Sequence, residues 1–133
     1  MNKDIRWKQR FQNFEKVFTE LENTAKIKKP SKAERAGLIQ FFEVCFELAW
    51  KMLKDYLESQ GFETKFPRDT LKQAFQSDLI EDGHIWMKAL EDRNLTTHTY
   101  DEKTSVKIEE LIRKKYLPLL KKLHQTFLGK QKE

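Results

Sequence analysis

Cysteine, glycine and proline are scarce in this sequence of 133 residues, and each scarcity excludes a class of structure. A single cysteine rules out an internal disulfide framework and a cysteine-based zinc site. The four glycines are dispersed and form neither G-x-x-x-x-G-K-[ST] nor G-x-G-x-x-G, so no phosphate-binding glycine loop is present. With no H-E-x-x-H motif and three isolated histidines, we expect neither a metal nor a cofactor.

Long apolar runs are also missing. No stretch of about 18 apolar residues occurs, so we expect no membrane-spanning segment. The N-terminal sequence MNKDIRWKQRF lacks the apolar region of a secretory signal. The length suits one domain, and ten Phe, three Trp and three Tyr argue against disorder. We therefore expect a single cytoplasmic domain over residues 1–133.

The net charge of +5 is unevenly distributed. Residues 1–32 carry a balance of +5 and residues 113–133 a balance of +6, whereas residues 33–112 carry −6. Such a chain can bind nucleic acid or a charged protein, or can simply expose solvated helix faces. Net charge alone does not choose between these interpretations.

Apolar residues at helical spacing predict an all-α fold. A first helix over residues 4–25 has one apolar stripe, which starts at Trp7 and Phe11 and ends at Ala25. A second helix over residues 32–60 begins with the capping-box pair Ser31 and Glu34 and ends before Gly61.

The second helix has an unusually wide apolar arc, because only a narrow polar stripe interrupts it. Two explanations fit this arc: the helix is central in the bundle, or it forms a homodimer interface. Cys45 lies within the arc and is expected to be buried. The polar stripe comprises Gln40, Glu43, Glu47, Lys51, Lys54 and Glu58.

Shorter helices follow. One begins at Pro67 and ends near Ser77, with Leu71, Ala74 and Phe75 predicted to face inward. Asp82 and Asp101 are predicted to cap the next two helices. Pro118 should kink or split the last helix near Tyr116. Together these elements predict an up-and-down bundle of four or five helices, with His84 and His124 exposed.

One stretch, EDRNLTTHTYD from Glu91 to Asp101, concentrates the groups suited to chemistry. Arg93 offers a bidentate fork for phosphate, and His98 is suited to acid–base catalysis near neutral pH. On an ideal helix, residues five apart point about 140° away from each other. Joint action of Arg93 and His98 therefore requires a helix break, which Thr96 and Thr97 permit, or a site shared by two chains. The alternative is an ordinary helix end in which Arg93 pairs with Asp92 or Glu91.

The spacing of Arg93, His98 and Tyr100 resembles the R-x4-H-x-Y signature of the HEPN superfamily. The chain is most similar to the branch of nucleotidyltransferase substrate-binding proteins. The resemblance covers nearly the whole chain, including IRWKQRFQNFEK, ERAGLIQFFEVCFELAWKMLKDYL, EDRNLTTHTYDE and YLPLL.

The resemblance implies a helical bundle similar to the C-terminal domain of kanamycin nucleotidyltransferase, usually dimeric and encoded beside a separate small nucleotidyltransferase. In related toxin–antitoxin pairs the HEPN protein is a metal-independent ribonuclease, and its partner modifies the motif tyrosine. By position, Arg93 would hold phosphate, Asn94 would orient the site, and His98 would be the acid/base. Thr97 would contribute to substrate binding, and Tyr100 would bind substrate and be the modified residue.

Two functions therefore fit this sequence. The chain is either the substrate-binding subunit of a two-component nucleotidyltransferase system, or a ribonuclease toxin neutralised by a nucleotidyltransferase antitoxin. It lacks a Gly-Ser turn followed by D-x-D, so it cannot itself be a polymerase-type nucleotidyltransferase. Whether it is an enzyme at all stays open, because the ribonuclease hypothesis depends on Arg93 and His98 meeting in one site. RNA or a nucleotide is the candidate ligand.

Overall fold

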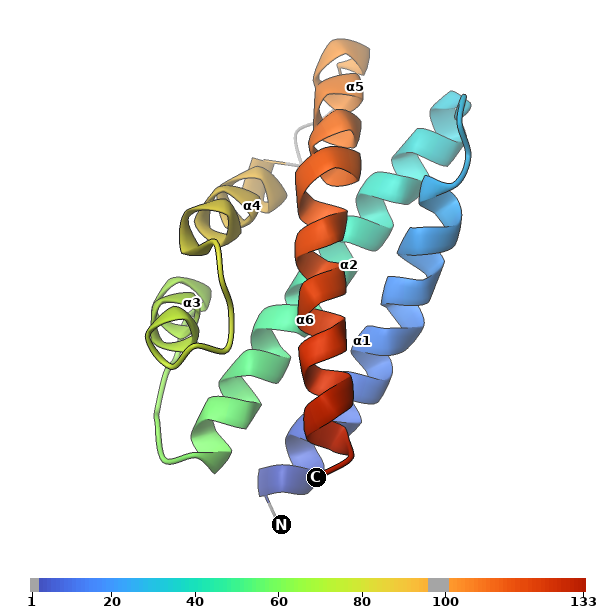
Figure 1. Cartoon of the computed structure of the whole chain (residues 1–133). Helices are drawn as coiled ribbons and strands as arrows, with labels where there is room; N and C mark the ends of the chain where they lie inside the picture. The colour runs from blue at the N-terminus through green and yellow to red at the C-terminus, as the bar shows by residue number, and fades with distance from the viewer. Residues whose placement is uncertain (1–2, 96–100) are drawn as a thin grey trace.

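The computed structural model describes residues 3–95 and 101–133, and every regular element in these two ranges is a helix. Figure 1 shows α1 (Lys3–Ala25) beside α2 (Lys32–Ser59), with the last long helix of the chain packed along them. The shorter helices α3 (Pro67–Gln76) and α4 (Gly83–Leu95) lie to one side. The predicted all-α bundle is confirmed.

Helix α1 forms because one apolar stripe repeats at helical spacing, and this stripe is buried. Its start lies one residue before the predicted residue 4, and its end at Ala25 matches the prediction. The buried members are Trp7, Phe11, Phe14, Phe18 and Leu21.

Helix α2 begins at the predicted capping box. The Ser31 hydroxyl accepts a hydrogen bond from the Glu34 N–H at 3.1 Å, and the Ser31 N–H donates to the Glu34 carboxylate at 2.8 Å. At the other end Gly61 has φ +92°, a conformation that glycine adopts without a steric penalty. The Phe62 N–H then reaches back to the Leu57 carbonyl at 2.9 Å. Both predicted ends of α2 are confirmed to within one residue.

The wide apolar arc of α2 is explained largely by its central place in the bundle. The helix packs against α1, α3, α4 and the start of the last long helix. Cys45 is buried, as predicted, whereas Val44 stays 40% exposed. The buried residues of α2 are Leu38, Ile39, Phe42, Cys45, Phe46, Ala49, Trp50, Met52, Leu53, Asp55 and Leu57.

Two predictions for the α3–α4 region need correction. Leu71 and Ala74 are buried, but Phe75 is 51% exposed, because its ring lies over the start of α4 and covers Gly83 instead of entering the core. Asp82 has φ +53°, and its predicted capping role falls to its backbone carbonyl, which accepts from the N–H groups of Ile85 and Trp86 in the first turn of α4. Its carboxylate lies 3.6 Å from the Lys122 ammonium.

The last long helix runs as α5 (Glu102–Leu111), a π-helical turn η2 (Ile112–Tyr116) and α6 (Leu117–Gln131). Asp101 caps α5 as predicted, accepting from the Lys103 N–H at 3.2 Å. The predicted irregularity before Pro118 is confirmed, because the Leu117 N–H bonds five residues back to the Ile112 carbonyl. Pro118 has no N–H to donate, and its ring crowds the preceding turn.

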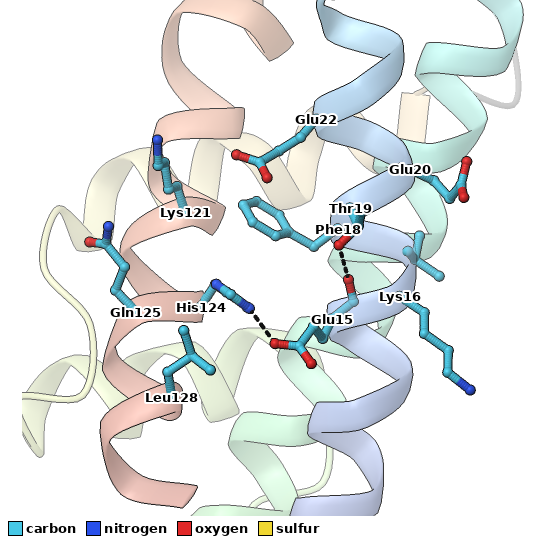
Figure 2. Close-up of a pocket in the computed structure, with 11 residues that line it drawn as sticks. Glu15, Lys16, Phe18, Thr19, Glu20, Glu22, Lys121, His124, Gln125 and Leu128 are labelled. Carbon is cyan, nitrogen blue, oxygen red and sulfur yellow. Dashed lines mark hydrogen bonds and ion pairs between the residues drawn. The ribbon is translucent and has the colours of Figure 1, made fainter. Parts of the chain in front are cut away.

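His124 differs from its predicted exposure, whereas His84 is exposed as predicted. The His124 side chain is only 17% exposed, because it stacks on Phe18 with ring centroids 4.9 Å apart. Its Nε2 is 2.8 Å from the Glu15 carboxylate. Figure 2 marks this contact with a dashed line. The basic residues around His124 in the sequence do not reveal these contacts, which come from α1.

Along the described ranges, no helix has the length and apolarity needed to cross a lipid bilayer.

Candidate functional site

The candidate site lies at the last turn of α4, where Arg93 faces the middle of α2. The Arg93 guanidinium forms an ion pair with the Glu47 carboxylate and donates to the Asn94 side-chain oxygen at 3.0 Å. Arg93 is about three-quarters buried, whereas Asn94 is exposed. Two predicted site residues, Arg93 and Asn94, are therefore adjacent and in contact.

Glu47 organises the α2 side of this site. Besides pairing with Arg93, its carboxylate accepts from the Trp50 indole N–H at 3.1 Å and lies 3.2 Å from the Lys51 ammonium. Sequence reasoning places Glu47 only on the polar stripe of a helix. The same stripe also contains Glu43 and Glu58, so no signal in the sequence singles out Glu47.

A groove of about 400 Å³ opens beside these residues. Its described lining includes two carboxylates of α2 and one guanidinium, so these lining residues carry a net negative charge. Val44, 40% exposed, adds an apolar edge. The lining residues are Glu43, Val44, Glu47, Leu48, Arg93 and Asn94.

Behind the groove, Asp92 anchors the same turn of α4 to η2. Asp92 is 4% exposed, and its carboxylate accepts a hydrogen bond from the Tyr116 hydroxyl and lies 3.7 Å from the Lys88 ammonium. The Tyr116 ring is fully buried and stacks on Phe42 with ring centroids 5.4 Å apart. Burial, and next the hydrogen bond to Asp92, raise the pKa of Tyr116 far above its usual value. Tyr116 is a structural residue of the site that sequence reasoning missed.

The other predicted site residues, Thr97, His98 and Tyr100, lie outside the described residues. The proposed meeting of Arg93 with His98 therefore stays a prediction. Described residues enclose the segment on both sides, since α4 ends at Leu95 and the Asp101 cap begins α5.

Chemically, the described part of the site can hold hydrogen-bonding groups but does not accumulate positive charge. Arg93 carries five N–H donors in a planar fork, of which the Glu47 carboxylate engages a part. A phosphate approaching this groove would face Glu43 and Glu47 as well as Arg93. Phosphate binding here therefore needs additional cations. Among the described residues, no group of three or more His, Cys, Asp or Glu side chains is arranged to hold a metal ion.

A second, wider groove of about 790 Å³ lies between α1 and α6 (Figure 2). His124 lies in its wall, held by Glu15 and the Phe18 ring. This groove contains none of the predicted site residues.

Comparisons with known proteins agree with the predicted family. Residues 9–128 match the family described as "Nucleotidyltransferase substrate binding protein like". A protein of Haemophilus influenzae named "Probable ribonuclease HepT" is 35% identical over 78 residues, which are 55% of this chain and 53% of that protein. The chain thus matches about half the length of this relative. A crystal structure of a protein from Thermus thermophilus aligns with a TM-score of 0.76 and 32% identity, covering 90% of this chain and 99% of that one.

Proposed function

Since the chain belongs to the family of nucleotidyltransferase substrate binding protein-like proteins, we propose that it is the substrate-binding subunit of a two-component system. The second component is a separate small nucleotidyltransferase, and the system operates in the cytoplasm. The family match over residues 9–128 carries this proposal. The absence of Gly-Ser and D-x-D motifs from the sequence supports it, because a companion subunit leaves nucleotide chemistry to its partner.

We propose further that the partner modifies this chain, with Tyr100 as the acceptor residue. Arg93 and Asn94 line the groove at the end of α4, and Tyr100 follows a few residues later in the sequence. In the proposed reaction the Tyr100 phenol oxygen attacks the α-phosphorus of a nucleoside triphosphate. A phosphodiester bond forms, pyrophosphate leaves, and the phenolic proton passes to a base supplied by the partner.

Mass spectrometry tests this proposal. The chain is incubated with the nucleotidyltransferase encoded beside it and ATP, and the expected product carries one nucleotidyl group on Tyr100. Tyr100→Phe should give no adduct, whereas the control Tyr56→Phe, which changes a half-buried tyrosine of α2, should be modified like the wild type. Failure of the two proteins to copurify, together with no adduct, would overturn the proposal.

A second candidate function is metal-independent cleavage of RNA, favoured by the similarity to the Haemophilus influenzae protein named as a probable ribonuclease. In this reaction a 2′-hydroxyl attacks the adjacent phosphate, the 5′-oxygen leaves, and a 2′,3′-cyclic phosphate forms. His98 serves as the acid/base and Arg93 stabilises the phosphate charge. A nucleotidyl group on Tyr100 would then block the site, as an antitoxin must.

The ribonuclease candidate predicts that cleavage persists in EDTA and is lost in His98→Ala. The matched control is His84→Ala, because His84 is an exposed histidine at the start of α4. Equal cleavage by His98→Ala and the wild type would exclude this mechanism. Growth arrest on expression without the partner would favour a toxin over a pure binding subunit.

We further propose that the chain forms a homodimer, which would bring two copies of the Arg93 groove together. The exposed edge at Val44 supports this proposal, because it leaves apolar surface directly beside the groove. Light scattering on the purified chain tests it: Val44→Glu should shift a dimer toward monomer, whereas Val106→Glu, at an exposed valine of α5, should not.

A further inference from the structure

A third groove, of about 550 Å³, lies between α3 and α4, here called the α3–α4 groove. These two helices pack against each other, and Figure 1 shows them side by side on one side of the bundle. The groove is distinct from the Arg93 groove, because the two have no lining residue in common. Its apolar lining comes from both helices, and a lysine and a histidine add polar edges. These residues are Leu71, Lys72, Phe75, Gly83, His84 and Met87.

The Phe75 ring is the main apolar feature of the α3–α4 groove. Phe75 is 51% exposed, and its ring lies against Gly83, where an added Cβ atom would come within 3.0 Å of the ring. The lack of a side chain at Gly83 therefore lets the ring pack against the start of α4 and form part of the groove wall. Met87, which is only partly buried, lies on the α4 side. The groove thus keeps apolar surface in contact with water, which is typical of a binding surface.

The α3 edge of the groove carries positive charge. Arg68 and Lys72 are both exposed and lie one helical turn apart on α3. The carboxylates of this region are engaged elsewhere. Asp69 accepts from two backbone N–H groups at the start of α3, and Asp82 lies 3.6 Å from the Lys122 ammonium. An apolar wall beside two cations therefore suits a ligand that combines an apolar group with negative charge.

These features favour a segment of a different protein over a second copy of this chain. Protein interfaces are enriched in aromatic residues, Met and Arg, the types found at Phe75, Met87 and Arg68. In a two-fold symmetric dimer the same surface meets itself, so Arg68 and Lys72 would face the cations of the other copy. An acidic segment of another protein avoids this repulsion.

We propose that the α3–α4 groove docks the partner nucleotidyltransferase, through an apolar side chain of the partner that is flanked by Asp or Glu. This proposal rests on the proposed function, because the two-component system supplies the occupant. Helix α4 links the groove to the candidate site: His84 and Arg93 are nine residues apart, which is about 14 Å along the helix axis. An interface of about 800 Å² on each protein is roughly 30 Å across, so one docked partner can also reach the Arg93 end of α4.

Isothermal titration calorimetry of the full chain with the purified nucleotidyltransferase encoded beside it tests the charged edge. The charge variant combines Arg68→Glu and Lys72→Glu and should weaken binding about tenfold, since attraction is replaced by repulsion at two exposed positions. Its affinity should also depend less on salt than that of the wild type. The control combines Lys16→Glu and Lys121→Glu, which change two exposed lysines of α1 and α6, and should bind like the wild type.

The apolar wall is tested separately by Phe75→Gln. Loss of a central aromatic anchor should weaken binding about thirtyfold. The matched control is Phe62→Gln, because Phe62 is 44% exposed but does not line the groove. Circular dichroism melts of all four proteins verify that each variant is folded at the temperature of the titration.

The outcomes separate this proposal from the proposed function. Wild-type affinity in the charge variant or in Phe75→Gln, or equal losses in a variant and its control, would refute the docking surface and leave the two-component function intact. A charge variant that changes the oligomeric state of the chain alone in light scattering would assign the groove to a second copy and would also refute it. No binding of the nucleotidyltransferase by the wild type, together with no Tyr100 adduct, would instead refute the proposed function.

Discussion

The hydroxyl of Tyr116 provides the sharpest test of how the site is built. Tyr116→Phe keeps the ring that stacks on Phe42 and removes only the donor to the buried Asp92 carboxylate. Hydrogen bonds to charged groups contribute about 1.5–3 kcal/mol, and the Lys88 ammonium remains 3.7 Å from Asp92. We therefore expect Tyr116→Phe to lower the free energy of unfolding by about 2 kcal/mol.

The same hydroxyl should also make stability depend on alkaline pH. Burial and the bond to Asp92 raise the pKa of Tyr116 in the folded chain, whereas an unfolded tyrosine ionises near a pKa of about 10. Above that pH the unfolded state releases a proton that the folded state retains, so stability falls as the pH rises. The loss approaches about 1.4 kcal/mol per pH unit from this group, and it should be absent in Tyr116→Phe.

Urea unfolding followed by circular dichroism, near neutral pH and above a pH of about 10, measures both effects. The control is Tyr56→Phe, because the half-buried Tyr56 ring packs on Trp7 and Phe127, away from the site. Asp92→Asn completes a double-mutant cycle with Tyr116→Phe. If Tyr116→Phe is as stable as the wild type, or if the alkaline slope survives it unchanged, the hydroxyl does not anchor α4.

Three further outcomes are expected. Burial raises the pKa of the Cys45 thiol, so stability should begin to fall above the unfolded thiol pKa of about 8.5, and Cys45→Ala should lack this component in urea unfolding against pH. Burial raises the pKa of Glu109, but hydrogen bonds from Arg35 and Arg113 outweigh it and lower the pKa overall. The stabilisation that ionised Glu109 provides is present above its unfolded pKa of about 4.3 and is lost as the pH falls below that value. Glu109→Gln should therefore reduce the fall in the free energy of unfolding at acidic pH. Ser31→Ala should lower the free energy of unfolding by about 1 kcal/mol in thermal melts. Ser31→Thr should keep most of the wild-type stability, because threonine also caps helices. Equal melting of Ser31→Ala and the wild type would contradict the capping role.

The helices are predictable because their signals are local. The Ser31 capping box depends on residues three apart, and Gly61 supplies a positive φ at the position where a helix ends. Pro118 predicts a local irregularity of the helix, since proline lacks a backbone N–H in every environment. Such features act through the backbone of one helix and need no knowledge of the rest of the fold.

The contacts of the site are less predictable because they join distant parts of the chain. The sequence predicts that Arg93 binds phosphate or pairs with a neighbouring acid, and the structure pairs it with Glu47 on α2. The basic neighbours of His124 in sequence predict an exposed side chain, yet the Phe18 ring of α1 covers it. In each case a second helix supplies the partner, and helical periodicity does not reveal which helices are neighbours.

The two anchors of α4 act together on its last turn. Adjacent helical residues point about 100° apart, so Asp92 reaches Tyr116 on η2 while Arg93 reaches Glu47 on α2. Two contacts in different directions fix the rotation of the last turn of α4 about its axis. The π-helical turn matters here because one residue more or less in η2 would turn Tyr116 away from Asp92. Tyr116 thus stabilises the last turn of α4 without belonging to the motif.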